Sequence, residues 1–211
     1  MKTINNYIIE KLHVTKNLVK TYNPQSRGEL LDNILEVVDK NGPTADLSVI
    51  NVKEITDMSY VFNTDELLDF NGDVSSWDVS NVTNMEGMFY NCKKFDGDLS
   101  KWNTSKLDNA SYMFAICTKF TGKGLKNWNV EKLYKATEMF ADCGQFKEDL
   151  SNWNPKNLQD ACGMFSGCYS FKCDLNGWKP NFYNINDAED MFKDADKINP
   201  LPKWYYDLLN K

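Results

Sequence analysis

Apolar residues recur in this chain at a fixed long period, which is the strongest pattern in its sequence. Six tryptophans follow one another at steps of 25 or 26 residues, from Trp77 to Trp204. A ladder of phenylalanines that begins at Phe70 and a ladder of aliphatic residues that begins at Val74 keep the same step. Such a period is typical of a repeat protein, in which each unit buries its apolar face against its neighbours.

Each repeat unit combines two local patterns. Residues 95–103, like their counterparts in other units, are too few for a helix and indicate extended chain with a turn. The second half places apolar residues at i, i+3, i+4 and i+7, as at Met85, Met88, Phe89 and Cys92, which predicts about two turns of helix. We therefore expect an α/β repeat solenoid of the leucine-rich-repeat type. It would be a right-handed stack of about six coils, each with a short extended segment and a short helix.

The pattern divides the chain into four segments. Residues 1–20 form a leader with a weak helical pattern, either a docking peptide or a surface helix or frayed end. Residues 21–45 are expected to form a helical N-terminal cap, residues 46–197 the six-unit solenoid, and residues 198–211 a C-terminal cap. The ends need covers because an open coil would expose apolar groups and unpaired edges.

The N-terminal cap carries its own helix signals. Ser26 and Glu29 have the S-x-x-E spacing of a capping box, in which both side chains satisfy backbone donors at a helix start. An apolar stripe at helical spacing follows from Leu30. Gly42 and Pro43 then predict the end of the helix, because glycine permits a left-handed exit and proline cannot continue a helix.

One repeat unit resembles a known family. Residues 70–89 resemble the repeat of BspA-like leucine-rich-repeat surface proteins, which also occurs in mycoplasmal surface lipoproteins and some phage proteins. The resemblance implies a leucine-rich-repeat-type solenoid used for surface display or protein binding, with no family-wide catalytic residues. The chain shows no signal peptide, lipobox or wall anchor, so the exported role of the surface proteins does not follow.

Composition and charge narrow the possible partners. The chain is 42% hydrophobic, enough for a core, and its formal net charge is −6. This charge disfavours nucleic acid and anionic membranes, both of which bind mainly clustered Lys and Arg. The apolar run at residues 7–9 is too short for a secretory signal, and no stretch approaches a membrane span. We expect a cytoplasmic or particle-associated protein rather than one at the cell surface.

Cysteine usage favours reduced thiols in the core. Four of the six cysteines share one register and complete the apolar face formed by Met and Phe, where free Cys behaves as a small hydrophobe. The alternative is a disulfide framework, which this long chain without a secretory signal does not favour. With no C-x-x-C pair and one histidine, zinc is not expected. The four cysteines in register are Cys92, Cys117, Cys143 and Cys168.

Two other ladders have a functional and a structural interpretation. Asp73, Asp98, Asp149 and Asp174 share one position and could form a calcium ladder, or each could cap a turn through nearby backbone donors. Gly124 occupies this position in one unit, which favours turn capping; no metal is expected. The tryptophans could form an aromatic strip for glycans, although their fixed spacing from an aliphatic residue favours a core or half-buried position.

Catalysis has little support in the sequence. The sole histidine, His13, lies in the leader, and no P-loop or G-x-S-x-G motif is present. We expect neither an enzyme nor a cofactor.

The favoured function is a non-catalytic scaffold for protein–protein interaction, whose partner and oligomeric state the sequence does not identify. The alternatives are a structural or packaged component of a phage or other particle, and a glycan- or calcium-binding surface module. Recognition in a solenoid lies on positions that vary between units. The candidate partner-surface residues are Tyr90, Lys94, Tyr112, Lys119, Tyr134, Lys135 and Tyr169.

Overall fold

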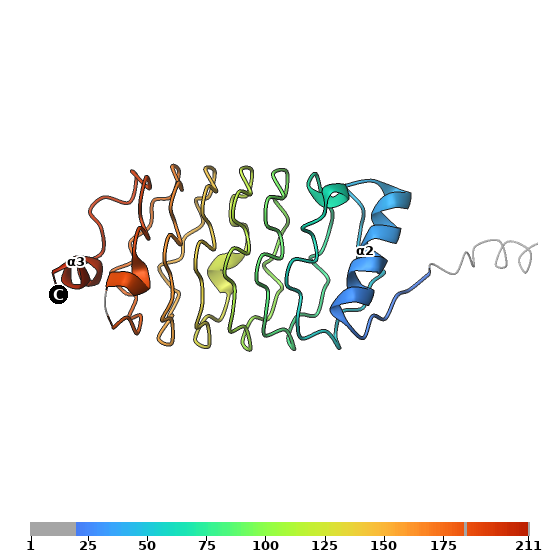
Figure 1. Ribbon diagram of the computed structural model, residues 1–211, viewed down its shortest axis with the longest axis horizontal. Coiled ribbons are helices and arrows are strands. Elements are labelled where there is room, and N and C mark those ends of the chain that lie inside the picture. The colour runs from blue at the N-terminus through green and yellow to red at the C-terminus, as the bar shows by residue number, and fades with distance from the viewer. Residues whose placement is uncertain (1–19, 184, 211) are drawn as a thin grey trace, which may run out of the picture.

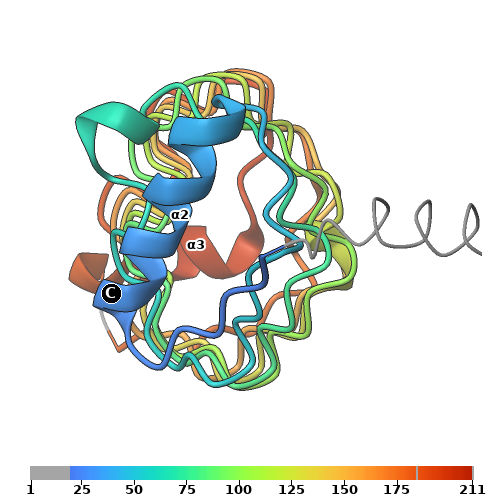
Figure 2. The same ribbon diagram turned by 90° about the vertical axis from the view of Figure 1, so that its right-hand side faces the viewer.

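The computed structural model describes residues 20–183 and 185–210 and shows a repeat solenoid. Its coils lie side by side along the long axis of the molecule (Figure 1) and superpose when viewed along that axis (Figure 2). Helix α2 (Arg27–Asn41) closes one end and helix α3 (Lys203–Leu209) closes the other. The leader, expected to be either a docking peptide or a surface helix or frayed end, lies outside the described residues apart from Lys20.

The coils contain few regular elements. Between α2 and α3, the described chain holds three short 3-10 helices: η1 (Asp65–Leu67), η2 (Leu125–Asn127) and η3 (Ile185–Ala188). Coil-to-coil pairing appears as isolated parallel bridges rather than named strands. The predicted α/β class, with a short helix in every coil, is therefore wrong. The stacked repeat architecture itself is present.

Turns replace the predicted helices. In the second coil, the Met88 N–H donates to the Met85 carbonyl (3.1 Å), the Tyr90 N–H to the Gly87 carbonyl (3.0 Å) and the Cys92 N–H to the Phe89 carbonyl (2.9 Å), which closes three overlapping β-turns. Other amides donate to the next coil, as Met85 does to the Asn109 carbonyl (2.8 Å). We call this surface of turns the turn ribbon. It comprises residues 57–63, 84–92, 109–117, 135–143, 160–168 and 187–195.

The turn ribbon explains why the sequence suggested helices. β-Turns that begin at every second residue bury side chains at positions 0, 3, 4 and 7, which is also the pattern of one helix face. The two structures differ in where the backbone amides bond. A helix would bond each amide to the carbonyl four residues earlier, whereas here alternate amides bond about 25 residues ahead, in the neighbouring coil.

The predicted ladders form the core. Phe89, Phe114 and Phe140 are fully buried, and their ring centroids follow one another at 5.8 and 5.7 Å. Each tryptophan of the ladder donates its indole N–H to a carbonyl of the preceding coil, as Trp128 does to Leu99 at 3.2 Å. Stacked rings thus hold neighbouring coils in register, as the repeat pattern predicted.

The N-terminal cap follows its sequence signals closely. The Ser26 side chain accepts a hydrogen bond from the Glu29 N–H (3.2 Å), and the Glu29 carboxylate accepts one from the Gln25 N–H (2.8 Å), one residue before the expected donor. Gly42 ends the helix with φ of 82°. Leu30 is among the residues that bury the inner face of α2 against the first coil.

Candidate protein-binding face

The turn ribbon carries side chains that change from coil to coil. At one register position every described coil has a positive φ, between 49° and 60°. The residues at this position, in chain order, are Tyr60, Gly87, Tyr112, Glu138, Gly163 and Asp190. The frame is therefore constant while the group at this position varies from a hydrogen atom to a phenol or a carboxylate.

Several of these residues occupy the left-handed region at a cost. Tyr112 has φ of 58° and Ile116, four residues on in the same ribbon, has φ of 64°. An L-residue other than glycine pays roughly 1–2 kcal/mol in this region, and a β-branched residue is an outlier there. The same two positions in a later coil are Gly163 and Gly167, so glycine also fits the ribbon. Some coils therefore carry a bulky residue here at a cost in backbone strain that glycine would avoid.

Tyr60 is held rigidly on the ribbon. A Cβ atom at Gly87 would lie 2.1 Å from Cε1 of Tyr60, so the tyrosine ring covers the glycine of the next coil. The Tyr60 hydroxyl donates to Glu86 Oε1 (3.0 Å), and Asn109 Nδ2 donates to Glu86 Oε2 (3.0 Å). Burial and this hydrogen bond to a carboxylate raise the pKa of Tyr60 to about 12. Three successive coils are thereby tied together at the surface.

Two of the predicted partner residues lie on the ribbons next along the solenoid from this tyrosine. Tyr90 and Tyr112 belong to the two coils that follow the coil of Tyr60, and both are half-buried. Burial, followed by the carboxylates of Glu138, Asp160 and Glu86, raises the pKa of Tyr112. Tyr60, Tyr90 and Tyr112 thus lie on three successive ribbons at the N-terminal half of the face, and we call these three residues the tyrosine cluster.

The other predicted residues are spread along the same side of the solenoid. Lys94 and Lys119 are exposed at the corner that follows the ribbon, and Lys94 pairs with Asp69 (Nζ to Oδ2, 2.8 Å). Tyr134 and Lys135 line a hollow of about 350 Å³. Tyr169 is 55% exposed at the corner of a later coil. These residues do not form one cluster with Tyr90 and Tyr112.

Three surface residues were missed by sequence reasoning. Tyr60 lies in the first coil, which lacks the tryptophan of later units, so its register was not apparent. Ile116 was not singled out, because an apolar residue gives no sign in the sequence that it lies on the outer side of the turn ribbon. Tyr183 is 68% exposed and lines the same hollow as Tyr134 and Lys135. It lies in the last coil, where proline and an altered spacing interrupt the repeat.

The aspartate ladder is used for turn capping. Asp98 Oδ1 accepts the Ser100 N–H at 3.0 Å, and Asp73 and Asp149 accept the amides of the serines two residues on. Hydrogen bonds from Ser100, with help from Lys123, lower the pKa of Asp98 to about 2. Among the described residues, no group of three or more His, Cys, Asp or Glu side chains could hold a metal ion.

The tryptophan and cysteine ladders face inward. Trp77, Trp102, Trp128, Trp153 and Trp178 are 1–4% exposed. The aromatic glycan strip considered for these residues is therefore wrong, because a sugar could not reach the rings. The four cysteines in register are buried free thiols, three of which donate to a phenylalanine carbonyl of the preceding coil at 2.9–3.0 Å.

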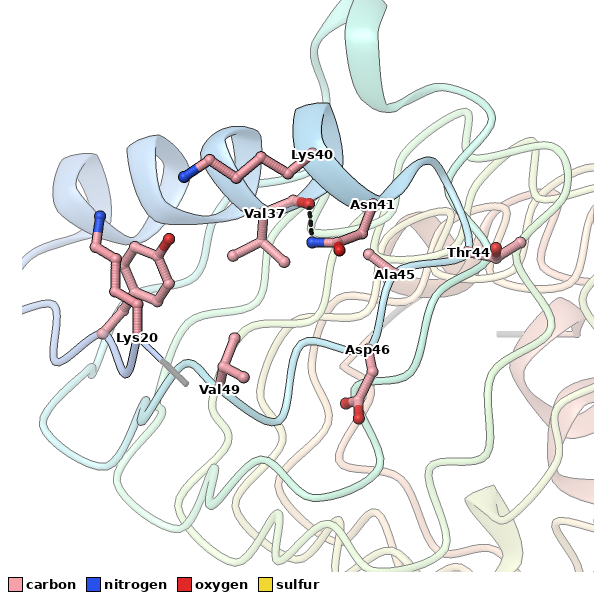
Figure 3. A pocket seen from close by; sticks show the side chains of 9 residues that line it. Lys20, Val37, Lys40, Asn41, Thr44, Ala45, Asp46 and Val49 are labelled. Carbon is pink, nitrogen blue, oxygen red and sulfur yellow. Dashed lines mark hydrogen bonds between the residues drawn. The ribbon is translucent and has the colours of Figure 1, made fainter. Parts of the chain in front are cut away.

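A further hollow lies between α2 and the first coil (Figure 3). It measures about 490 Å³ and is open, with Lys20 and Lys40 near its rim. Both ammonium groups pair with Glu36, which lowers the pKa of this carboxylate to about 2. On its other side, Asn41 Nδ2 donates to the Val37 carbonyl (2.8 Å). The lysines and Asn41 beside this hollow thus already have partners within the cap.

The sequence matches a known protein family over most of its length. Residues 32–123 and 117–204 match the family described as "Mycoplasma protein of unknown function, DUF285". The chain belongs to this family. As a DUF285 member it is a repeat protein whose family description names no activity. No curated protein matches the chain. In the part of the chain that the structure describes, no helix is long and apolar enough to cross a membrane.

Solved structures include distant likenesses to this DUF285 protein. It is similar to the leucine-rich-repeat protein of T. pallidum (TpLRR), with 13% sequence identity and a TM-score of 0.42, over 74% of this chain and 78% of that one. It is also similar to a chain of the TLR13–ssRNA13 complex, with 13% identity and a TM-score of 0.24. That second likeness covers 70% of this chain and 26% of the other.

Proposed function

We propose that this protein is a non-catalytic repeat scaffold that binds another protein through the turn ribbon. The observation that carries the proposal is the set of bulky residues in the left-handed region, Tyr60, Tyr112 and Ile116, on the outer surface. Strained backbone of this kind clusters at functional sites, because stability alone would select glycine or asparagine there. Tyrosine also offers a large contact area at a low cost in conformational entropy.

The sequence resemblance supports the same function. The repeat resembles that of BspA-like leucine-rich-repeat surface proteins, which implies surface display or protein binding without catalysis. In such a solenoid the buried ladders build the frame and the outward positions select the partner. Tyr90, Tyr112 and Tyr60 would then provide the anchoring contacts, since aromatic residues dominate the energetics of interfaces.

Fewer observations support the two alternative functions, a glycan- or calcium-binding module and a component of a phage or other particle. A calcium-binding role would draw on the ladder aspartates, whose carboxylates already accept backbone amides in turns. A glycan-binding role would need exposed aromatic residues other than the buried tryptophans. A role as a component of a phage or other particle would need self-association or packaging, for which the ends of the solenoid, rather than its turn ribbon, are the relevant surfaces.

A comparison of variants tests the scaffold proposal. In a quantitative pull-down with the full chain as bait, Tyr112→Gly combined with Ile116→Gly should remove a partner that the natural chain retains. The variant should fold, because glycine occupies the equivalent positions 163 and 167. The matched control is Lys101→Ser combined with Lys126→Ser, two exposed residues outside the ribbon, which should retain the partner. Retention of every partner by the glycine variant would contradict the proposal.

A further inference from the structure

The last coil presents hydrogen-bond donors that no neighbour accepts. In the described part of the chain, the backbone N–H groups of Asp190, Phe192 and Asp194 have no acceptor. Their counterparts one coil earlier all donate to this last ribbon, at 2.8–2.9 Å. Those counterparts are Gly163, Phe165 and Gly167. The three free amides recur at every second residue, which is the spacing of the unpaired backbone N–H groups along the open edge of a β-sheet.

The two ends of the turn ribbon are therefore finished differently. At the N-terminal end, α2 lies across the stack (Figure 2), and Arg27 Nη1 donates to the Ser59 carbonyl of the first ribbon at 3.0 Å. At the C-terminal end, α3 contacts the last ribbon through Tyr205, whose ring packs edge-on against Phe192 at 5.0 Å and whose hydroxyl donates to the Ala188 carbonyl (3.3 Å). The edge itself is left open, with Asp190 and Asp194 exposed.

The surface beside this edge is acidic. A hollow of about 350 Å³ opens between the ribbons of the last three coils. Its one ammonium group, from Lys193, pairs with Asp190 (Nζ to Oδ2, 3.0 Å), so the other carboxylates outnumber it. The carboxylates that line the hollow belong to Glu138, Asp142, Glu189, Asp190 and Asp194. A segment that pairs with this edge should therefore carry positive charge.

The chain contains a segment of the required charge. Residues 1–19 contain Lys2, Lys11 and Lys16 and one acidic residue, Glu10, so their formal charge is +2. Since the net charge of the chain is −6, the other residues together carry −8. This segment precedes Lys20, which lies at the end of the solenoid opposite the free edge (Figure 1). To reach the edge of its own copy, it would have to run extended along the whole stack.

We infer that residues 1–19 of one copy pair with the last turn ribbon of a second copy. Backbone carbonyls of the leader accept hydrogen bonds from Asp190, Phe192 and Asp194, as in strand addition to a sheet edge. The lysines of the leader lie against the acidic hollow. Because each copy contributes one leader and one edge, the contact is head-to-tail and builds an open chain of copies or a ring. This inference is independent of the partner proposed for the tyrosine cluster.

Sedimentation velocity of the full chain at increasing concentration tests the pairing. The natural chain should self-associate, more strongly at low salt because the contact is partly ionic. Lys11→Glu with Lys16→Glu, or Asp190→Asn with Asp194→Asn, should each lower the association constant by at least about tenfold. Asparagine tolerates the left-handed backbone of both edge positions, so the second variant should fold. The matched control, Asp32→Asn with Asp39→Asn on α2, should associate like the natural chain.

Hydrogen exchange locates the contact. On association, residues 188–195 of the natural chain should gain protection, and the leader variant should lose it. The inference is overturned if the natural chain stays monomeric at every concentration, or if the leader and edge variants associate as strongly as the control. Protection of residues 188–195 in a monomer would also overturn it, because the leader would then pair within its own copy.

Discussion

At the scale of single residues, the repeated side chains of this solenoid satisfy backbone groups that regular strands and helices would otherwise pair. The Trp128 indole N–H donates to the Leu99 carbonyl, and the Cys117 thiol donates to the Phe89 carbonyl at 2.9 Å. The Asp98 carboxylate accepts a hydrogen bond from the Ser100 N–H of its own turn. A buried unpaired backbone group costs roughly as much as a lost hydrogen bond. The ladders are thus part of the backbone hydrogen bonding as well as of the apolar core.

The first residue-scale prediction concerns the buried thiols. Burial raises the pKa of Cys92 to about 12 and that of Cys143 well above its ordinary value, so almost no thiolate is available near neutral pH. In a chain with Cys162→Ser and Cys173→Ser, the four remaining cysteines should react slowly with a maleimide when folded and completely in denaturant. Intact-mass measurement counts the labels, and rapid labelling of the folded chain would contradict this prediction.

The second residue-scale prediction is the acid sensitivity of the turn at Asp98. Its folded pKa of about 2 lies below the ordinary 3.8, so the stability it contributes is present above about pH 4 and lost as the pH falls towards 2. Asp98→Asn should lessen the fall in the free energy of unfolding between pH 5 and pH 2.5, measured by urea denaturation. Lys123→Met should retain most of the fall, because the Ser100 hydrogen bonds are the larger cause.

At the scale of elements, the sequence predicted the caps better than the coils. The helix of the N-terminal cap follows from local signals, since Ser26, Glu29 and Gly42 act within a few residues of one another. The turn ribbon does not follow from local signals, because its amides bond to residues about 25 positions away. The spacing of its inward-facing side chains also fits a helix. The alternation of inward and outward residues was visible in the sequence; the conformation that produces it was not.

The candidate protein-binding face could also be predicted from the sequence only in part. Sequence variation between units indicated Tyr90 and Tyr112 as outward residues, and the structure places both on the turn ribbon. The positive φ of Tyr112 and Ile116 could not be predicted, because neither residue favours that region. Their conformation is imposed by the turns of the neighbouring coils. Strain of this kind is a property of the stack and leaves no mark in the local sequence.

The element-scale prediction compares two glycines. Gly87→Ala should be destabilising, because its φ of 55° alone costs roughly 1–2 kcal/mol and its Cβ would also meet the Tyr60 ring. Gly28→Ala is the control: it lies in the first turn of α2 with no atom within 4 Å of an added Cβ, so stability should hold or rise by up to about 1 kcal/mol. Urea denaturation measures both variants. A neutral Gly87→Ala would mean that Tyr60 does not cover the ribbon.

At the scale of the whole molecule, the fold is one-dimensional. Each coil contacts the coils on either side through stacked rings and ribbon hydrogen bonds, so stability is close to a sum of coil and interface contributions. The ends differ: Arg27 of α2 bonds the N-terminal ribbon, whereas α3 contacts the C-terminal ribbon without accepting a hydrogen bond from the Asp190 or Asp194 N–H in the described part of the chain. Such a stack has a direction, which suits a scaffold that presents one face to a partner and one end to another copy.

The last prediction follows from this one-dimensional stability. Phe140 is fully buried in the middle of the array, with ring centroids 5.7 Å from Phe114, 4.4 Å from Phe146 and 5.5 Å from Phe165. Phe140→Ala should cost roughly 3–5 kcal/mol, as large-to-small core changes do. Because the lesion separates two halves that contact each other only through the altered coil, the urea unfolding transition should also broaden.

Phe192→Ala, in the last coil, is the matched comparison. It should expose amides of the last coil to hydrogen exchange while the first coils keep their protection, because an end coil can open without its distant neighbours. If Phe140→Ala changes the free energy of unfolding by less than about 1 kcal/mol, Phe140 is not a core residue. If instead both variants unfold in one sharp transition with equal loss of protection in every coil, the solenoid is a single cooperative unit. The stability of one coil would then not depend on its place in the stack.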